Sequence, residues 1–443
     1  MKKILFIIFD ILVLYGSIYF SFKIFGEQLE AYGENVQAFL IISPLIAFFY
    51  LLFLYIFDLQ DVMRRKLQEI IYAVFLITLG LTLSVMAVCF FVRGGAMAFP
   101  RSVILLSSIC WFVGLLLVRC INRYYQRYSH GVKDVVVVGD KVESLLYNLD
   151  RHYKDLYCVK HVCANNDSSL MKKIASCKEI FISADVPENI RRKLFVYQSK
   201  HDVQIYFVPK YSDITVMNSS MFPTDDIPTY ALSRLDLTVE ERAQKRIFDI
   251  FLAILGCIVG LPFFVITVIL VKLDGGPVFY IQERLTCNKK LFKVYKFRTM
   301  VPHAELLSGP VLSGENDPRI TKVGRFLRAT RLDELPQIYN VLRGDMSIVG
   351  PRPERPFFVE QFEDEMPEYA FRMKVKAGLT GLAQVMGKYN TSAAEKLRYD
   401  LMYIARYSLL GDLLIVLRTV KVLFMKESTE GVQLQTNIIS EEE

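Results

Sequence analysis

The patterns that hold zinc ions and disulfide frameworks are missing from this chain. Its eight cysteines include no C-x-x-C pair and form no cluster with the five histidines, which are dispersed. Structural zinc sites and disulfide frameworks depend on such spacings, so the sequence argues against both. We therefore expect the cysteines to be small apolar residues in a reducing compartment.

A complete dinucleotide-binding fingerprint is also missing. The apolar run DVVVVGD (134–140) ends in Gly139, but DKV follows where a G-x-G-x-x-G pattern requires further glycines. Between residues 133 and 217, short apolar runs alternate with helical patterns, which predicts a small parallel α/β domain. We expect this domain to have a structural or assembly role rather than to bind a nucleotide.

Long apolar runs are abundant instead, and 53% of the residues are hydrophobic. Four runs lie at 4–25, 38–57, 70–92 and 102–118, each near the ~20 residues that a spanning helix needs. They predict a four-helix transmembrane domain over residues 1–122. The net charge of +7 is compatible with an anionic membrane surface or an anionic substrate. Nucleic acid is the alternative, but the apolar runs and the lack of a nucleic-acid motif argue against that partner.

The first apolar run also resembles a signal peptide. Asp10 interrupts the run and no A-x-A cleavage site follows, so we expect a retained helix. Basic residues gather in alternate loops, around Lys2, Arg65 and Arg123. The positive-inside rule places these loops in the cytoplasm, and four crossings return the chain there.

A fifth apolar segment, at about 247–272, has two interpretations. Its 22 residues from 250 to 271 carry no charge and would make a helix of about 33 Å, which is long enough to cross a membrane. Basic residues flank both ends, as suits a segment whose ends share one compartment. Gly260 and Pro262 lie at its middle, where proline removes a backbone donor. The sequence favours a helix–break–helix that re-enters one leaflet, with a fifth transmembrane helix as the alternative.

An adjacent acidic pair, Asp333 and Glu334, lies in a strongly basic stretch. The run LPQIYNVLRG that follows is a helical pattern ending at Gly344, and we expect Asp333 to be its N-cap. Adjacent helical side chains do not face each other, so one carboxylate is a candidate nucleophile and the other a candidate Mg²⁺ ligand. Nearby cations would offset the repulsion between a carboxylate and a phosphate. The pattern indicates phosphoryl transfer, with a capping residue and solvated salt bridges as the alternative.

Several long motifs occur in order from residue 240 onward: KRIFDI, LPFF, GGPVFYIQER, FKVYKFRTM, TRLDELPQIYNVLRGDMSIVGPRPERP, AGLTGLAQV and YDLMYIARYSLLGDLLIVLRTV. They resemble the bacterial sugar transferases, which are monotopic phosphoglycosyl transferases. The four spans and a degenerate Rossmann-like α/β domain resemble the large branch of that family. The resemblance implies a membrane protein of the α plus α/β class, with a linker at 218–239, a mainly helical monotopic catalytic domain at 240–426 and a polar tail at 427–443.

The resemblance also implies a reaction. A UDP-sugar would give its sugar-1-phosphate to undecaprenyl phosphate and release UMP, at the cytoplasmic face of the bacterial inner membrane. This would be the first membrane step of exopolysaccharide, capsule or O-antigen biosynthesis. Glucose or galactose is the expected sugar. The alternatives are an N-acetylated or diamino sugar, a one-step transfer, and a membrane-anchored nucleotide-sensing regulatory protein. Membrane lipids are further expected partners, and a homodimer through the middle domain stays open.

The resemblance assigns roles to individual residues. Asp333 matches the nucleophile that forms a covalent phosphosugar intermediate, and Glu334 matches its partner, which helps to hold Mg²⁺. The other implied residues are Arg328 for the polyprenyl phosphate, Pro351, Arg352 and Pro353 for uridine, Lys296 and Arg298 for phosphate, and Gly260 and Pro262 for the helix break.

Two segments leave the comparison open. The loop LTCNKK (285–290) replaces a G-x-x-G pattern that is frequent in the family, so the contacts of this loop are not implied. The helical run at 409–424 is apolar but carries Arg418 and Lys421. It is expected either at the membrane interface or as a packed core helix.

Overall fold

The structure is a computed structural model that describes residues 2–25, 32–60, 62–63, 65, 67–91, 100–217, 219–232, 235–302, 317–387 and 391–423. It contains two compact units, Met1–Val208 and Pro209–Glu443. The polar tail expected at 427–443 lies outside the described residues.

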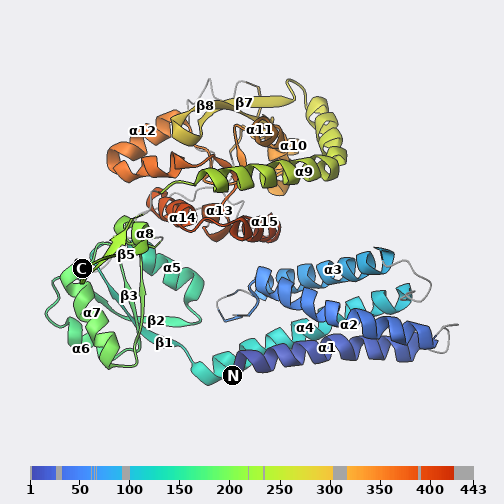
Figure 1. Cartoon of the computed structure of the whole chain (residues 1–443), viewed down its shortest axis with the longest axis horizontal. Coiled ribbons are helices and arrows are strands. Elements are labelled where there is room, and N and C mark those ends of the chain that lie inside the picture. Colours follow the sequence, from blue (N-terminus) through green and yellow to red (C-terminus); the bar gives the residue numbers. More distant parts are fainter. Residues whose placement is uncertain are drawn as a thin grey trace. The chain divides into compact units, whose positions relative to one another are not determined.

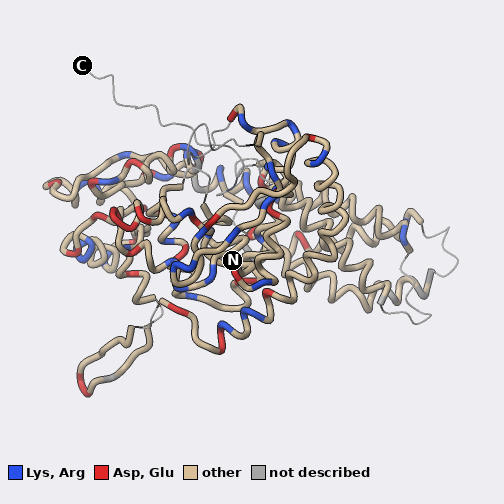
Figure 2. Tube along the Cα trace, turned by 90° about the horizontal axis from the view of Figure 1, so that it is seen from above, with Lys and Arg blue, Asp and Glu red and all other residues tan. Residues whose placement is uncertain are grey.

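Four long helices open the first unit: α1 (Lys2–Phe25), α2 (Tyr32–Ile56), α3 (Leu67–Phe91) and α4 (Arg101–His130). Each is long and apolar enough to cross a membrane, as the sequence predicted. Figure 2 shows them almost without charged residues along most of their length. The orientation argument rested on basic residues around Lys2, Arg65 and Arg123; the side chain of Lys2 lies outside the described residues, and the orientation stays a prediction.

The charge that interrupts the first apolar run has a partner inside this helix bundle. Asp10 is fully buried and pairs with Arg119 of α4, whose Nη2 also donates to the Tyr50 hydroxyl at 2.9 Å. Ionisable groups among apolar helices are costly unless they pair with one another. Asp10 therefore serves to join α1 to α4 and α2 instead of ending the helix.

The first unit continues as a parallel α/β sheet, as predicted. Its strands have the order β2-β1-β3-β4. Val136 and Val138 of β1 pack on one face with Leu194 of α7, while Val137 packs on the other with Leu149 of α5. The elements are β1 (Lys133–Val138), α5 (Glu143–Tyr153), β2 (Tyr157–Cys163), α6 (Leu170–Ile174), β3 (Glu179–Ile182), α7 (Glu188–Lys200) and β4 (Gln204–Phe207).

The second unit is mainly helical. Its first elements are α8 (Tyr211–Val216), the hairpin β5 (Ser220–Thr224) and β6 (Ile227–Ala231), α9 (Val239–Leu273), η2 (Cys287–Lys289) between β7 (Phe279–Leu285) and β8 (Leu291–Phe297), and α10 (Lys322–Thr330). The segment at 218–239, expected as a linker, thus holds a two-stranded antiparallel hairpin. The strands β7 and β8 form a second antiparallel pair.

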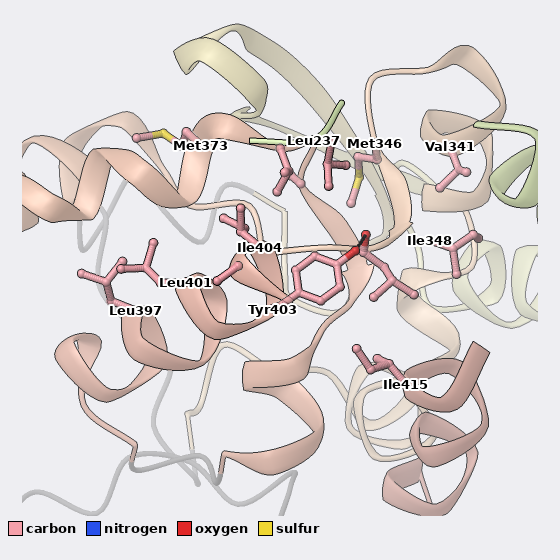
Figure 3. Packing of buried hydrophobic residues seen from close by; sticks show 14 of the residues in the cluster. Leu237, Val341, Met346, Ile348, Met373, Leu397, Leu401, Tyr403, Ile404 and Ile415 are labelled. Atoms are coloured by element: carbon pink, nitrogen blue, oxygen red, sulfur yellow. Dashed lines mark hydrogen bonds between the residues drawn. The ribbon is translucent and has the colours of Figure 1, made fainter. Parts of the chain in front are cut away.

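The rest of the second unit packs around one core. It comprises η3 (Leu332–Glu334), α11 (Gln337–Arg343), β9 (Ser347–Val349), α12 (Pro356–Glu365), η4 (Pro367–Lys374), β10 (Gly378–Thr380), α13 (Leu382–Met386), α14 (Ala393–Ala405) and α15 (Leu409–Leu423). Figure 3 shows side chains of this core, among them Leu401, Tyr403 and Ile404 of α14, together with Ile348 of β9 and Ile415 of α15. The helix α15 buries Ile415 but leaves Leu410 exposed, so it combines a core face with an exposed apolar face.

The fifth apolar segment differs from its predicted form. The sequence favoured two helices separated at Gly260 and Pro262, over about 247–272, but α9 is one helix of 35 residues with Pro262 inside it. A proline removes one helical hydrogen bond and kinks a helix without always ending it. In Figure 1 the ribbon of α9 changes direction part way along, where its colour passes from green to yellow. The change of direction expected at this segment is present, and the break in the helix is not.

Candidate functional site

The acidic pair lies in a short 3₁₀ turn between two helices. After α10, Arg331 adopts a left-handed conformation (φ 56°), and Leu332–Glu334 form the turn η3. Pro336, not Asp333, is the N-cap of α11. The prediction that Asp333 caps this helix was wrong, because the chain already turns helically at 332–334. The predicted end at Gly344 is confirmed, since its φ of 92° places it in the left-handed region.

Two distant basic residues meet on Glu334. Its Oε1 accepts a hydrogen bond from Lys296 Nζ of β8 and another from Arg352 Nη2, each at 2.8 Å. The Glu334 side chain is only 13% exposed. Three residues that the sequence proposed separately are therefore brought together, from positions 296, 334 and 352.

The two carboxyl groups of the pair have opposite pKa shifts. Burial would raise the pKa of Glu334, but Arg352 and Lys296 outweigh it and hold that pKa well below its usual value. Burial, together with the charge of Glu334, raises the pKa of Asp333 to about 6. Neighbouring carboxyls with divergent pKa values can take different chemical roles. Glu334 is the fixed anion, and Asp333 is the group whose charge changes near neutral pH.

Arg328 lies at the end of α10 close to the pair. Its Nε donates to the Thr299 hydroxyl at 2.9 Å. Its charge lowers the pKa of Asp333, together with those of Lys296 and Arg352. Arg328 is therefore close enough to act on an anion that binds beside Asp333.

Arg298, for which the resemblance implies a contact with phosphate, is bound to backbone carbonyl groups. It is 6% exposed. Its guanidinium donates to the carbonyl oxygens of Pro277 at 2.8 Å, Met300 at 3.2 Å and Val271 at 3.3 Å, and also to that of Gly275. With this many backbone partners Arg298 joins the end of α9 to β8, and its expected contact with phosphate stays a prediction.

Pro351 and Pro353 flank Arg352 in an extended segment after β9. A small cavity of about 10 Å³ lies beside this segment. Its lining includes Thr286, Pro351, Arg352, Glu354 and Arg372. The cavity joins apolar walls to cationic groups, but its volume has room for only about one water molecule, so the uridine contacts expected of Pro351, Arg352 and Pro353 stay a prediction.

The helix α9 supports the site through two polar residues to which the sequence gave no role. Arg246 donates to the carbonyls of Val341 (2.6 Å) and Leu342 (2.8 Å) at the end of α11. The carboxylate of Asp249 accepts from the Ser347 hydroxyl and the Ile348 backbone N–H, both at 2.9 Å. A signal existed in KRIFDI, where charges open an apolar segment, but the partners lie about a hundred residues away.

The middle of α9 lies over the turn that carries the acidic pair. A Cβ built on Gly260 would lie 3.6 Å from Leu335 Cδ2, and one on Gly256 would lie 3.3 Å from Ile338 Cδ1. The glycines allow the helix to approach this turn closely. Gly260 therefore belongs to the packing around the site, and Pro262 lies two residues later in the same helix.

Asn340 is a further residue that the sequence did not single out. It is fully buried, its Nδ2 donates to the Lys293 carbonyl at 2.7 Å, and its Oδ1 accepts from the Tyr295 N–H at 3.2 Å. These bonds attach α11 to β8. They fix the strand that carries Lys296 relative to the helix that follows Glu334.

The loop LTCNKK has its own anchors. The Thr286 hydroxyl donates to the Asp345 carbonyl at 3.0 Å and accepts from the Ala377 N–H at 3.1 Å. Lys289 pairs with Glu363 at 2.6 Å. Asn288 and Lys289 have positive φ angles of 57° and 58°, a conformation that favours glycine. The loop keeps a glycine-type turn without the glycines.

The turn after β1 offers the rival site, a nucleotide pocket in the α/β domain. There the Asp185 carboxylate accepts from the backbone N–H groups of Asp140 (2.7 Å) and Lys141 (3.3 Å). Backbone N–H groups at such a turn bind phosphate in dinucleotide domains. A carboxylate of the chain itself occupies them here, which argues against a phosphate at this position.

The chemistry of the acidic pair suits a hard cation. Both hydrogen bonds of Glu334 fall on Oε1, which leaves Oε2 available among the residues that the structure describes. Carboxylate oxygens are the donors that Mg²⁺ prefers, usually one or two of them with substrate phosphates. Across the described ranges no cluster of three or more His, Cys, Asp or Glu is present, so a Mg²⁺ site here would need substrate oxygens.

Comparison with known proteins points to one family. Residues 240–426 match the family described as "Bacterial sugar transferase". The chain is 30% identical over 356 residues to "Galactosyl transferase CpsE" of Streptococcus agalactiae, covering 70% of this chain and 77% of that protein. It is 35% identical over 257 residues to "UDP-glucose:undecaprenyl-phosphate glucose-1-phosphate transferase" of Escherichia coli, covering 56% and 55%.

A third relative names another sugar. It is "UDP-N-acetylgalactosamine-undecaprenyl-phosphate N-acetylgalactosaminephosphotransferase" of Aeromonas hydrophila, 41% identical over 181 residues, or 40% of this chain and 43% of that protein. The chain thus spans about half of the Escherichia coli relative and less than half of the Aeromonas one. The resemblance found in the motifs is nevertheless confirmed across the catalytic region. The chain belongs to the bacterial sugar transferase family and is an enzyme of the transferase class.

Proposed function

We propose that the chain transfers a sugar-1-phosphate from a UDP-sugar to undecaprenyl phosphate and releases UMP. The observation that carries this proposal is the shared contact of Lys296 and Arg352 with Glu334, beside an Asp333 whose pKa is raised to about 6. The names of the three relatives specify transfer of galactose, glucose-1-phosphate or N-acetylgalactosamine phosphate. UDP-glucose or UDP-galactose is the proposed donor, and UDP-N-acetylgalactosamine is the alternative that the Aeromonas relative favours.

The proposed reaction has two displacements. A carboxylate oxygen of Asp333 attacks the sugar-bearing phosphorus of the donor, the bond to the bridging oxygen breaks, and UMP leaves. A phosphate oxygen of undecaprenyl phosphate then attacks the same phosphorus. The aspartyl–phosphorus bond breaks and Asp333 returns to its ionised form. In each step, one bond to the phosphorus forms and one bond to it breaks.

The residues around Asp333 lower the electrostatic cost of both steps. Preorganised cations stabilise negative charge that gathers on a transferring phosphoryl group, and Lys296, Arg328 and Arg352 are placed to do so. Glu334 would help to hold Mg²⁺, which when bound would neutralise part of the diphosphate charge. Glu334 also orients Lys296 and Arg352 through its Oε1.

We propose further that α9 re-enters the membrane and that the catalytic unit faces the cytoplasm. Near its start Lys245 is bound to Asp412, and near its end the Val271 carbonyl is bound by Arg298. Both ends thus contact the same unit. A straight helix of this length would separate its ends by about 50 Å, which places them on opposite sides of a bilayer. The bend after Gly260 is consistent with a return to one side.

Asp333→Asn tests the proposed chemistry. The purified variant should release no UMP from any UDP-sugar, because an amide oxygen is a poor nucleophile toward phosphorus. The wild-type chain given UDP-sugar without lipid acceptor should release about one UMP per enzyme. Full turnover by Asp333→Asn would reject the nucleophile. A wild-type chain that needs the acceptor for any UMP release would support a one-step transfer.

A further inference from the structure

Each backbone carbonyl of the segment from Pro351 to Glu354 accepts a hydrogen bond from a residue outside the segment. The Pro351 carbonyl accepts from the Gly378 N–H at 2.8 Å, and the Glu354 carbonyl accepts from the Leu285 N–H at 3.0 Å. Because two of its four residues are prolines, the segment has few backbone donors with which to hold itself. Its shape therefore depends on groups from other elements.

Arginine side chains hold the two central carbonyls. Arg372 Nη2 donates to the Arg352 carbonyl at 3.0 Å. Arg284 Nη1 donates to the Pro353 carbonyl at 3.1 Å. Neither arginine has a hydrogen bond to Asp333 or Glu334 among the described residues. Both act on the backbone that carries the Arg352 side chain to Glu334.

Arg372 is itself fixed by buried partners. Its Nε and Nη2 contact Asp400 Oδ2 at 2.9 and 2.8 Å, and its Nη1 donates to the Tyr369 hydroxyl at 2.5 Å. The side chains of Arg372 and Asp400 are 7% and 2% exposed. Removing a buried charge pair from water costs much free energy, so such a pair offers little net stability. Here each nitrogen of the Arg372 guanidinium has a hydrogen-bond partner. The pair does provide a rigid, directed donor.

We propose that Arg284 and Arg372 are positioning residues that clamp the backbone on either side of Arg352, so that its guanidinium reaches Glu334. Arg352 also lines the cavity next to the segment, as does Arg372. The clamp therefore sets both the contact with Glu334 and the wall of the cavity. This inference rests on the proposed function, in which Arg352 and Glu334 serve the donor diphosphate.

A double-mutant cycle on the full chain in lipid nanodiscs tests the clamp. The proteins are wild type, Arg352→Ala, Arg372→Met and the double variant, assayed for UMP release from UDP-glucose, UDP-galactose and UDP-N-acetylgalactosamine with undecaprenyl phosphate. A lost hydrogen bond to a charged group corresponds to roughly ten- to hundred-fold in rate. Arg372→Met should lower kcat/KM about tenfold. The shares of this loss that come from a lower kcat and from a higher KM should be the same as in Arg352→Ala. The double variant should match Arg352→Ala within about twofold.

Two comparisons separate positioning from general stability. Asp412→Asn removes another buried ion pair of the same unit, with Lys245, and its effect should multiply with that of Arg352→Ala. Arg372→Lys keeps a donor for the Arg352 carbonyl and should recover part of the activity. If Arg372→Met does not fold, Arg284→Met carries the same prediction, because its side chain is 20% exposed and less of the core depends on it.

The outcomes are distinct. Independent, multiplying effects of Arg352→Ala and Arg372→Met would overturn the clamp, and so would unchanged activity in Arg372→Met. If the wild type releases no UMP from any donor, the proposed function fails. The clamp is then tested by a binding measurement that does not depend on catalysis. The measurement is the rise in melting temperature caused by UDP in the same four proteins. The clamp is supported if the double variant loses less of this UDP-induced rise than the sum of the losses in the two single variants. It is overturned if the two losses add in the double variant.

Discussion

Removal of Lys296 should move the pH dependence of the reaction in a defined direction. Burial and Glu334 raise the pKa of Asp333 to about 6, while Lys296 lowers it. A nucleophilic Asp333 must be ionised, so activity is present above pH 6 and is lost as the pH falls through that value. Lys296→Met removes a cation that favours the ionised form. The acid limb of the rate profile should therefore move to higher pH.

The structure sets the size of the shift. Lys296 Nζ lies 2.8 Å from Glu334 Oε1, and the two side chains are 24% and 13% exposed. A nearby opposite charge lowers the pKa of a carboxyl group by about 1–3 units, and Arg328 and Arg352 still lower the pKa of Asp333 in the variant. A change of about 1.4 kcal/mol in the energy of one protonation state is one pKa unit. We expect a shift of about one unit, together with a loss of maximal rate of about tenfold or more.

The assay is UMP release in a single turnover, measured from pH 5 to 8 with UDP-glucose or UDP-galactose. Lys293→Met is the matched control, because Lys293 lies three residues earlier on β8 with an exposed side chain. Its profile should coincide with that of the wild type. A folded Lys296→Met protein whose acid limb stays in place would refute the electrostatic reasoning.

Two further predictions concern the metal and the junction of α11 with β8. Removal of divalent cations with EDTA should abolish UMP release, and Mg²⁺ should restore it better than Ca²⁺, because the pair offers few ligands and depends on substrate oxygens; activity that persists without divalent cations would remove Mg²⁺ from the account. Asn340→Leu should lower the free energy of unfolding by about 2 kcal/mol or more, since the Lys293 carbonyl and the Tyr295 N–H lose their buried partner; a melting temperature equal to that of the wild type would contradict the role of Asn340.

Local patterns predicted the parts of the site that lie close together in the chain. The adjacent carboxylates, the helix end at Gly344 and the four apolar helices all follow from residues within one or two turns of each other. The N-cap role given to Asp333 failed because a 3₁₀ turn at 332–334 competes with the start of the next helix. The cap of α11 therefore lies three residues later, at Pro336.

Roles that depend on distant partners were harder to infer. Arg298 and Lys296 stand two residues apart in one basic motif, yet β8 ends at Phe297, so the strand alternation no longer fixes where Arg298 points. The partners of Asp249 and Arg372 lie on elements far away in the sequence. The continuous course of α9 through Pro262 also depended on packing that a single sequence does not encode locally.

The proposal of a covalent intermediate on Asp333 is the central claim, and mass spectrometry tests it directly. The wild-type chain is treated with a UDP-sugar in the absence of undecaprenyl phosphate, acidified and digested, and the peptide containing Asp333 is analysed. The account predicts a sugar-phosphate adduct on Asp333 that disappears when undecaprenyl phosphate is added before quenching. Release of UMP with every Asp333 peptide unmodified, or with the adduct on another residue, would contradict it.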